Sequence, residues 1–482
     1  MQLVPLIIRG SVITDADVQF GGRRPETHFT TADVQRHIDR LVERQPAALS
    51  DLYTLRFEQI LDYLDELGRR LDFRTNHYLQ EAFRLSTTTS GLTELILRHL
   101  YADMHESFAR ETVRRVAEHG VGIRFLDGWV ETPIDRGVRS RVRAFGARSV
   151  HVVAGNVPGV SAATIIRGVV TRSDLIIKTP SNDPLTAVAI ARTMIEMAPD
   201  HPITRHMSVA YWKGGDTSVE TEVYQPRNIE KIIAWGGLAS ISHISRYLQP
   251  GIDLITLDPK MSSSIVGRGA FASEASMTEA ARRLAHDIGI YNQEACLCAR
   301  VVYVQSGTDA AGLELANRFG RMVYEQIQRL PPHVSAPQPQ LDPALREQLE
   351  GLRFTPLYEL VSGGGPEGGV IVSQIDEPVE FAHLLNNRVA NLVPIDDLDT
   401  AIRATTSYTQ TVGVHPPALI EEVSDSLALH GAQKVCSLGY AASAPIRSLA
   451  GPQDGMEPLR RMCKWVVQDV SDPHERPLAA DR

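Results

Sequence analysis

Residues 139–170 read RSRVRAFGARSVHVVAGNVPGVSAATIIRGVV. A β-rich run ends at VHVVA, a turn containing Gly, Asn and Pro follows, and the apolar positions then take helical spacing. The stretch therefore predicts a strand, a turn and a helix in immediate succession.

The same alternation continues to about residue 268. Strands alternating with helical stretches indicate βαβ units and a parallel sheet, and uninterrupted apolar runs are typical of strands that are covered on both faces. In such sheets ligands bind at the carboxyl ends of the strands. The further predicted strands are DLIIKTP (174–180), HMSVAYWKG (206–214), NIEKIIAWGG (228–237) and DLITLDP (253–259).

Two other regions flank this one. Residues 1–121 are predicted to be mainly helical, since apolar residues recur at three- and four-residue spacing between about 30 and 118. Residues 269–435 again mix helical and strand patterns and predict a second α/β unit. The first α/β unit is assigned to residues 150–268.

Composition excludes several classes of protein. The 482-residue chain carries a formal net charge of −9 with scattered basic residues, which argues against nucleic acid as a partner. Its N-terminus lacks the basic region of a secretion signal, and no run of 18 apolar residues predicts a membrane span. Four cysteines are too few for a disulfide scaffold, so we expect a cytoplasmic protein.

Cys296 and Cys298 lie where a predicted helix gives way to a strand, a position at which a thiol could face a cleft. Two cysteines at this spacing are more often small buried residues of a strand. A metal site is disfavoured, because Cys436 and Cys463 are distant and no CxxC or HxxxH spacing occurs.

Residues that could bind a substrate or cofactor lie at the ends of three of the predicted strands. Asn156 could stabilise an oxyanion, although Asn beside Gly is also a common turn residue. Lys178 could meet a phosphate or ribose, or could simply be a solvated strand end. Gly236 and Gly237 open a predicted helix, whose backbone N–H groups suit a phosphate.

Taken in order, these segments resemble the aldehyde dehydrogenase superfamily over residues 125–470. The resemblance implies a Rossmann-type cofactor domain, an α/β catalytic domain and small oligomerisation strands. It implies that Cys296 is the nucleophile, Asn156 the oxyanion donor and Lys178 a ligand of the adenosine ribose. Gly236 and Gly237 would lie at the cofactor phosphates.

Three short motifs resemble the acyl-CoA reductase branch, which includes the bacterial luminescence fatty acyl-CoA reductases: DPKMS (258–262), TQTVG (409–413) and DGMEPL (454–459). The branch has Gln where this chain has Glu294, and serines where it has Leu297 and Cys298. The second glutamate of the superfamily, in an E-x-F-G-P motif, has no counterpart that we could place.

Two substitutions bear on the chemistry that the resemblance implies. Hydrolytic members carry a water-activating Glu where this chain has Thr256, so an acyl-enzyme here should survive to be reduced. NAD-preferring members place a Glu where this chain has Ser181, so we expect NADPH to be the cofactor.

The resemblance thus implies NADPH-dependent reduction of an acyl-CoA to an aldehyde through a thioester on Cys296. A carrier-protein thioester, CoA acylation of an aldehyde and a catalytically silent binding subunit remain alternatives. Residues 122–149 and 436–482 are expected to supply oligomerisation strands, so we expect a homo-oligomer.

Overall fold

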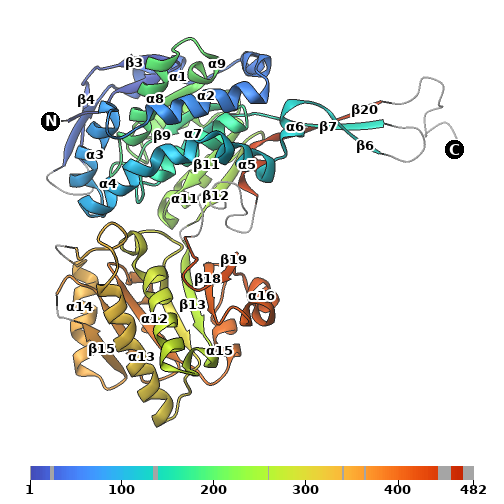
Figure 1. The fold of residues 1–482 in the computed structure, drawn as a ribbon. Helices are drawn as coiled ribbons and strands as arrows, with labels where there is room; N and C mark the ends of the chain where they lie inside the picture. The colour runs from blue at the N-terminus through green and yellow to red at the C-terminus, as the bar shows by residue number, and fades with distance from the viewer. Residues whose placement is uncertain are drawn as a thin grey trace.

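The computed structural model describes residues 2–21, 27–133, 139–258, 260–338, 341–362, 365–442 and 457–470. Figure 1 shows two lobes, one above the other, and a narrow arm that extends sideways from the upper lobe. Each lobe is built on a seven-stranded sheet. In the described part of the chain, no helix combines the length and the hydropathy needed to cross a membrane.

The sheet of the upper lobe has the strand order β12-β11-β8-β9-β10-β2-β3. Five neighbouring strands are parallel, as predicted, and β2 and β3 extend the sheet with antiparallel pairing. Every residue of β9 is buried, which explains the apolar run from Leu175 to Ile177 at its centre. The strands are β2 (Leu6–Ile8), β3 (Ser11–Ile13), β8 (Arg148–Val152), β9 (Asp174–Lys178), β10 (Met207–Ala210), β11 (Lys231–Trp235) and β12 (Asp253–Leu257).

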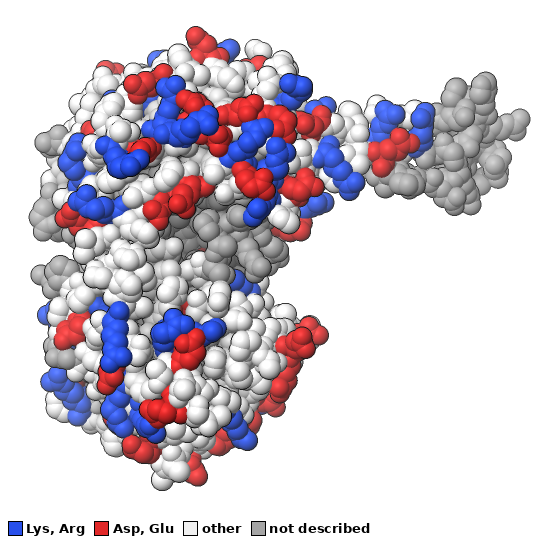
Figure 2. Space-filling model, in the orientation of Figure 1, with Lys and Arg blue, Asp and Glu red and all other residues white. Residues whose placement is uncertain are grey.

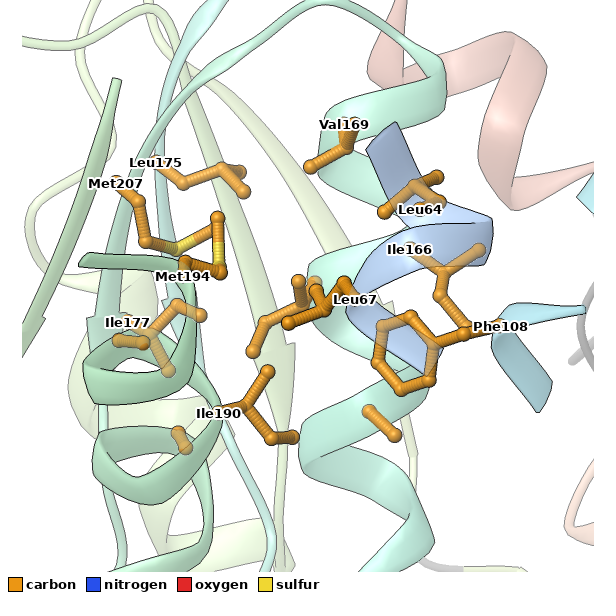
Figure 3. Close-up of a cluster of buried hydrophobic side chains, with 14 of the residues drawn as sticks. Leu64, Leu67, Phe108, Ile166, Val169, Leu175, Ile177, Ile190, Met194 and Met207 are labelled. Atoms are coloured by element: carbon orange, nitrogen blue, oxygen red, sulfur yellow. The ribbon is translucent and has the colours of Figure 1, made fainter. Parts of the chain in front are cut away.

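Helices cover this sheet and bury a large apolar cluster. Figure 3 shows Leu64 and Leu67 of α2 in one cluster with Ile166 of α7 and Ile190 of α8. All four side chains are fully buried, and burial of each contributes about 1.5–3 kcal/mol. The helices concerned are α2 (Phe57–Arg70), α3 (His77–Thr89), α7 (Gly159–Val170) and α8 (Thr186–Met197).

The described residues 2–21 and 27–31 contain strands that the sequence did not predict. Besides β2 and β3, they contain a small sheet with the order β1-β5-β4. Strands of two to four residues offer too few positions for a two-residue period to stand out. The small sheet consists of β1 (Gln2–Leu3), β4 (Val18–Gly21) and β5 (His28–Thr31).

Helical segments occupy most of the chain from residue 34 to 127. Four further helices, α9, α10, α11 and α18, lie later in the chain and belong to the upper lobe or its connections. The α-helices are α1 (Ile38–Leu41), α4 (Glu94–Asp103), α5 (Arg110–Gly120), α6 (Ile123–Asp127), α9 (Pro202–Arg205), α10 (Thr217–Val223), α11 (Leu238–Ser245) and α18 (Pro458–Met462). The 3-10 turns are η1 (Val34–His37), η2 (Pro46–Thr54) and η3 (Met104–Phe108).

The sheet of the lower lobe has the order β15-β16-β17-β14-β13-β18-β19, and only the β15–β16 pair in it is antiparallel. Strand β13 belongs to this sheet, so the chain leaves the upper sheet before the boundary expected at residue 268. The strands are β13 (Met261–Val266), β14 (Ala299–Val304), β15 (Tyr358–Ser362), β16 (Gly369–Ser373), β17 (Val389–Pro394), β18 (Thr409–His415) and β19 (Lys434–Ser437).

Two apolar clusters lie against this sheet, one under the long α12 and α13 and one under α15 and α16. A smaller apolar cluster packs α14 against the sheet. The helices are α12 (Glu274–Gly289), α13 (Ala310–Gln328), α14 (Pro343–Gly351), α15 (Leu398–Arg403) and α16 (Leu419–His430). The 3-10 turns are η4 (Arg268–Phe271), η5 (Ile290–Gln293), η6 (Leu352–Phe354) and η7 (Ala382–Leu384).

The arm is a three-stranded antiparallel sheet with the order β20-β7-β6 (Figure 1). It joins β6 (Val130–Pro133) and β7 (Arg139–Phe145) to β20 (Lys464–Val470). The two segments expected to supply oligomerisation strands thus pair with each other within one chain. The expected extension of residues 122–149 also contains helix α6 and the start of β8. The parts of the expected C-terminal segment at 443–456 and 471–482 lie outside the described residues.

Charges of both signs are interspersed on the face of the upper lobe that Figure 2 shows. Many are paired: Arg110, for example, contacts both Glu58 and Asp62. Such exposed pairs contribute little to stability, a median of about 0–1 kcal/mol each.

Candidate active site

The segment before Cys296 is a strained turn. Tyr291, Asn292 and Gln293 all have left-handed backbone conformations, with φ of 52°, 49° and 67°. Residues other than glycine rarely adopt this region, and each instance costs on the order of 1–3 kcal/mol. Surrounding contacts must therefore hold the turn in place.

Two buried amide side chains provide those contacts. Gln293 donates from Nε2 to the carbonyls of Ala299 (2.8 Å) and Val389 (2.9 Å), and its Oε1 accepts from the Val389 N–H (3.1 Å). Asn292 Oδ1 accepts from the hydroxyl of Ser335 and from a backbone N–H. The turn is thereby fixed to the starts of β14 and β17, and Cys296 is delivered just before β14 begins.

The two neighbouring cysteines have different surroundings. Cys298 is fully buried, its Sγ lies 3.2 Å from the Ile290 carbonyl, and burial raises the pKa of its thiol to about 12. Cys296 is half-buried. Cys298 therefore matches the buried-residue interpretation, whereas Cys296 keeps the exposure that a nucleophile needs. The four cysteines, all within the described chain, form no disulfide.

Asn156 lies beside residues 291–296, here called the cysteine turn, although it comes from the upper lobe. It follows β8, and its Nδ2 donates to the Glu294 carbonyl at 3.0 Å. Its backbone is not in the left-handed region, so the turn does not require Asn for that reason. An amide nitrogen carries two N–H groups, so Asn156 has a second N–H besides the one bonded to Glu294, the residue two positions before Cys296.

Asn182 is a residue that the sequence analysis did not select. Its Nδ2 donates to the Gly155 carbonyl at 2.8 Å, and both side chain and bond are buried. A Cβ at Gly155 would lie 2.2 Å from Asn182 Oδ1, so glycine is required there. Asn182 thus fixes the loop that carries Asn156. In the sequence, only its position directly after Ser181 could have indicated that it belongs to the site.

Lys178 ends β9 but is not a solvated strand end, since only 9% of it is exposed. Its Nζ lies 5.8 and 5.6 Å from the ring centroids of Tyr211 and Trp212. Burial lowers the pKa of Lys178 to about 8, although nearby Glu220 acts in the opposite direction. Ser181 is half-buried and shares a hydrogen bond with the Tyr211 hydroxyl.

Gly236 and Gly237 connect β11 to α11, as predicted, and Gly237 is the N-cap residue of that helix. A Cβ at Gly237 would meet no atom within 4 Å, so space is open above the helix terminus. Strands β11, β8 and β9 are parallel neighbours. The residues at or just beyond their carboxyl ends, Gly236, Asn156 and Lys178, therefore share one edge of the sheet, where cofactors bind in such folds.

Within the described ranges, no group of three or more His, Cys, Asp and Glu side chains is arranged to hold a metal ion. The arrangement offers a half-buried thiol, an amide donor and the carboxyl edge of a parallel sheet. Nucleophilic acyl chemistry with a dinucleotide is what these groups can support.

The architecture is that of the aldehyde dehydrogenases. An NADP-dependent glyceraldehyde-3-phosphate dehydrogenase from Bacillus halodurans, solved with NADP, superposes with a TM-score of 0.74 at 13% identity, covering 98% of this chain and 100% of that one. Lactaldehyde dehydrogenase from Escherichia coli gives 0.70 at 14% identity, covering 97% and 99%. At these identities the likeness concerns the fold alone, and it confirms the predicted fold class.

The chain belongs to the acyl-CoA reductase (LuxC) family, whose model matches residues 52–465. A long-chain acyl-protein thioester reductase from Photorhabdus laumondii is 31% identical over 75% of this chain and 70% of its own length. The enzyme of the same name from Aliivibrio fischeri is 28% identical over 89% and 85%. The predicted family is confirmed, and the protein is an aldehyde-forming oxidoreductase.

Proposed function

We propose that this protein uses NADPH to reduce an acyl thioester to an aldehyde, with the acyl group carried on Cys296. The observation that supports this most directly is the hydrogen bond from Asn156 to the Glu294 carbonyl. It joins an amide donor of the upper lobe to the turn that presents the thiol, which is the pairing that acyl transfer requires.

In the proposed cycle, the Cys296 thiolate attacks the carbonyl carbon of the thioester and a new C–S bond forms. The second N–H of Asn156 Nδ2 and the backbone N–H of Cys296 stabilise the oxyanion. Collapse breaks the original C–S bond, and the departing thiolate takes up a proton. NADPH, when bound, supplies the hydride that reduces the enzyme thioester. The resulting thiohemiacetal on Cys296 collapses, releasing the aldehyde and restoring the thiolate.

NADPH is proposed over NADH because of the residues at the end of β9. Ser181 is uncharged and does not repel a 2′-phosphate, whereas buried Lys178 is a cation that could pair with one. The open N-terminus of α11 at Gly237 suits the cofactor phosphates.

The thioester is proposed to be an acyl-CoA. A protein-bound acyl thioester is the second candidate, because the similar enzymes from Photorhabdus and Aliivibrio are named for that substrate. The two are distinguished by offering the same acyl chain as a CoA ester and as an acylated protein.

Acyl trapping tests the proposal. Incubation with an acyl-CoA and no nicotinamide should attach one acyl group per site. Cys296→Ala should abolish the attachment, and Cys298→Ala should leave it, so the second variant is a matched control two residues away. Peptide mass analysis locates the group. An acyl group that persists in Cys296→Ala would contradict the assignment.

A further inference from the structure

Ser262 is hydrogen bonded to the backbone of the proposed nucleophile. Its hydroxyl donates to the Cys296 carbonyl at 2.7 Å and accepts from the Thr411 N–H at 3.1 Å. The residue is 2% exposed, so water does not compete for these bonds. The hydroxyl therefore ties the cysteine turn to β18.

The lower sheet is irregular at this point on both sides of β13. From Met261 to Ser263 the chain advances two residues, whereas the paired positions in β18 advance three, from Thr409 to Val412. Toward β14, adjacent Ser262 and Ser263 pair with Ala299 and Val301, which leaves an extra residue there. Bulges of this kind re-aim side chains and are frequent beside active sites. They place the Ser262 hydroxyl within reach of backbone groups on either side.

We infer that Ser262 is a positioning residue for acyl transfer, which holds the Cys296 backbone in its reactive orientation; this inference rests on the proposed function. The cysteine turn is anchored from two lobes: Asn156 binds the Glu294 carbonyl from above, and Ser262 binds the Cys296 carbonyl from below. Between these anchors lie the thiol, which must face the acyl carbon, and the backbone N–H of Cys296, which must face the acyl oxygen. Loss of the lower anchor frees them to move, and a displacement of about 1 Å can slow a reaction by about 10²-fold.

Ser264 provides a matched control. It lies two residues farther along β13, is 1% exposed, and its Oγ is buried without a hydrogen-bond partner. Side chains alternate along a strand, so residues two apart, such as Ser262 and Ser264, point to the same face. Ser264→Ala removes an equally buried hydroxyl that has no bond to the cysteine turn.

The experiment measures single-turnover acylation of Cys296 by an acyl-CoA, together with NADPH affinity and the thermal midpoint. Ser262→Ala should slow acylation by about 10-fold or more, with NADPH affinity and KM unchanged. Ser264→Ala should leave the acylation rate unchanged. The pH midpoint for alkylation of Cys296 by iodoacetamide should not move in either variant, because Ser262 acts on the carbonyl.

A Thr and Val pair at position 262 decides the question if Ser262→Ala fails to fold. Both variants add the same methyl group and have nearly the same shape, but Thr keeps the hydroxyl and Val lacks it. Ser262→Thr should acylate faster than Ser262→Val. Equal rates in this pair, an unchanged rate in Ser262→Ala, or an equal loss in Ser264→Ala would overturn the inference. A different outcome, no acylation of the unsubstituted protein, would instead overturn the proposed function and the inference with it.

Discussion

Replacement of Asn156 by alanine tests the proposed chemistry most directly. The change removes two interactions: the bond from Nδ2 to the Glu294 carbonyl, observed at 3.0 Å, and the donor proposed for the oxyanion. Loss of one oxyanion donor typically costs about 2.7–4 kcal/mol of transition-state stabilisation, which is a 10²–10³-fold decrease in kcat. Loss of the structural bond costs about 1–3 kcal/mol of folding stability at most. Asn156→Ala should therefore lose about 10²–10³-fold in kcat, while its folding stability falls by no more than about 3 kcal/mol.

The assay follows formation of the acyl-enzyme in a single turnover, alongside NADPH affinity and the free energy of unfolding. Asn76→Ala is a suitable control. Asn76 caps the N-terminus of α3, and its Nδ2 also donates to a backbone carbonyl and to the buried hydroxyl of Thr193. It should lose stability while its folded fraction acylates normally. A loss in Asn156→Ala confined to KM would refute the reasoning, because a transition-state donor acts on kcat.

The remaining predictions concern the cofactor and the lifetime of the acyl-enzyme. NADPH should bind at least about tenfold more tightly than NADH, about 1.4 kcal/mol, and Lys178→Ala should weaken NADPH more than NADH; equal affinities in a fluorescence titration would defeat this. Because burial lowers the pKa of Lys178 to about 8, the side chain is charged below that pH and neutral above it. The preference for NADPH should thus be present below about pH 8 and decline as the pH rises, and since a bound phosphate favours the charged amine, the decline should start at higher pH in the complex. Thr256→Glu should place a general base where hydrolytic relatives of the fold carry one. It should speed the release of free acid from the acyl-enzyme, by about 10²–10⁴-fold for a well-placed base. Rapid acid release by the unsubstituted protein without NADPH would show that the missing carboxylate is not what protects the thioester.

Local patterns in the sequence predicted those parts of the molecule that depend on neighbouring residues. The apolar runs within DLIIK and KIIAW became buried parallel strands β9 and β11, because a strand covered on both faces favours apolar residues at successive positions. Lys178 is the last residue of β9 and Gly236 directly follows β11, so their common edge could be inferred from order alone. The resemblance predicts Cys296 as the nucleophile, and its neighbour Cys298 proved to be the buried one.

Contacts between distant segments decided the rest. Strand β2 joins the upper sheet by pairing with β10, some 200 residues later, and β13 joins the lower sheet rather than the upper one. No local pattern distinguishes those choices, since a short apolar strand can pair with any compatible edge.

What the sequence by itself determined is thus the longer elements and the chemical groups at their ends: the thiol of Cys296, the amide of Asn156 and the amine of Lys178. Only the tertiary structure decided how those groups are held. The left-handed turn before Cys296 is maintained by Gln293 bonded to the Val389 backbone, 96 residues away. The Ser262 hydroxyl reaches the Cys296 carbonyl where β14 and β18 each carry one extra residue opposite β13. Strain and register of this kind are stable only when the packed structure supplies the compensating bonds, so they leave no trace in the order of residues.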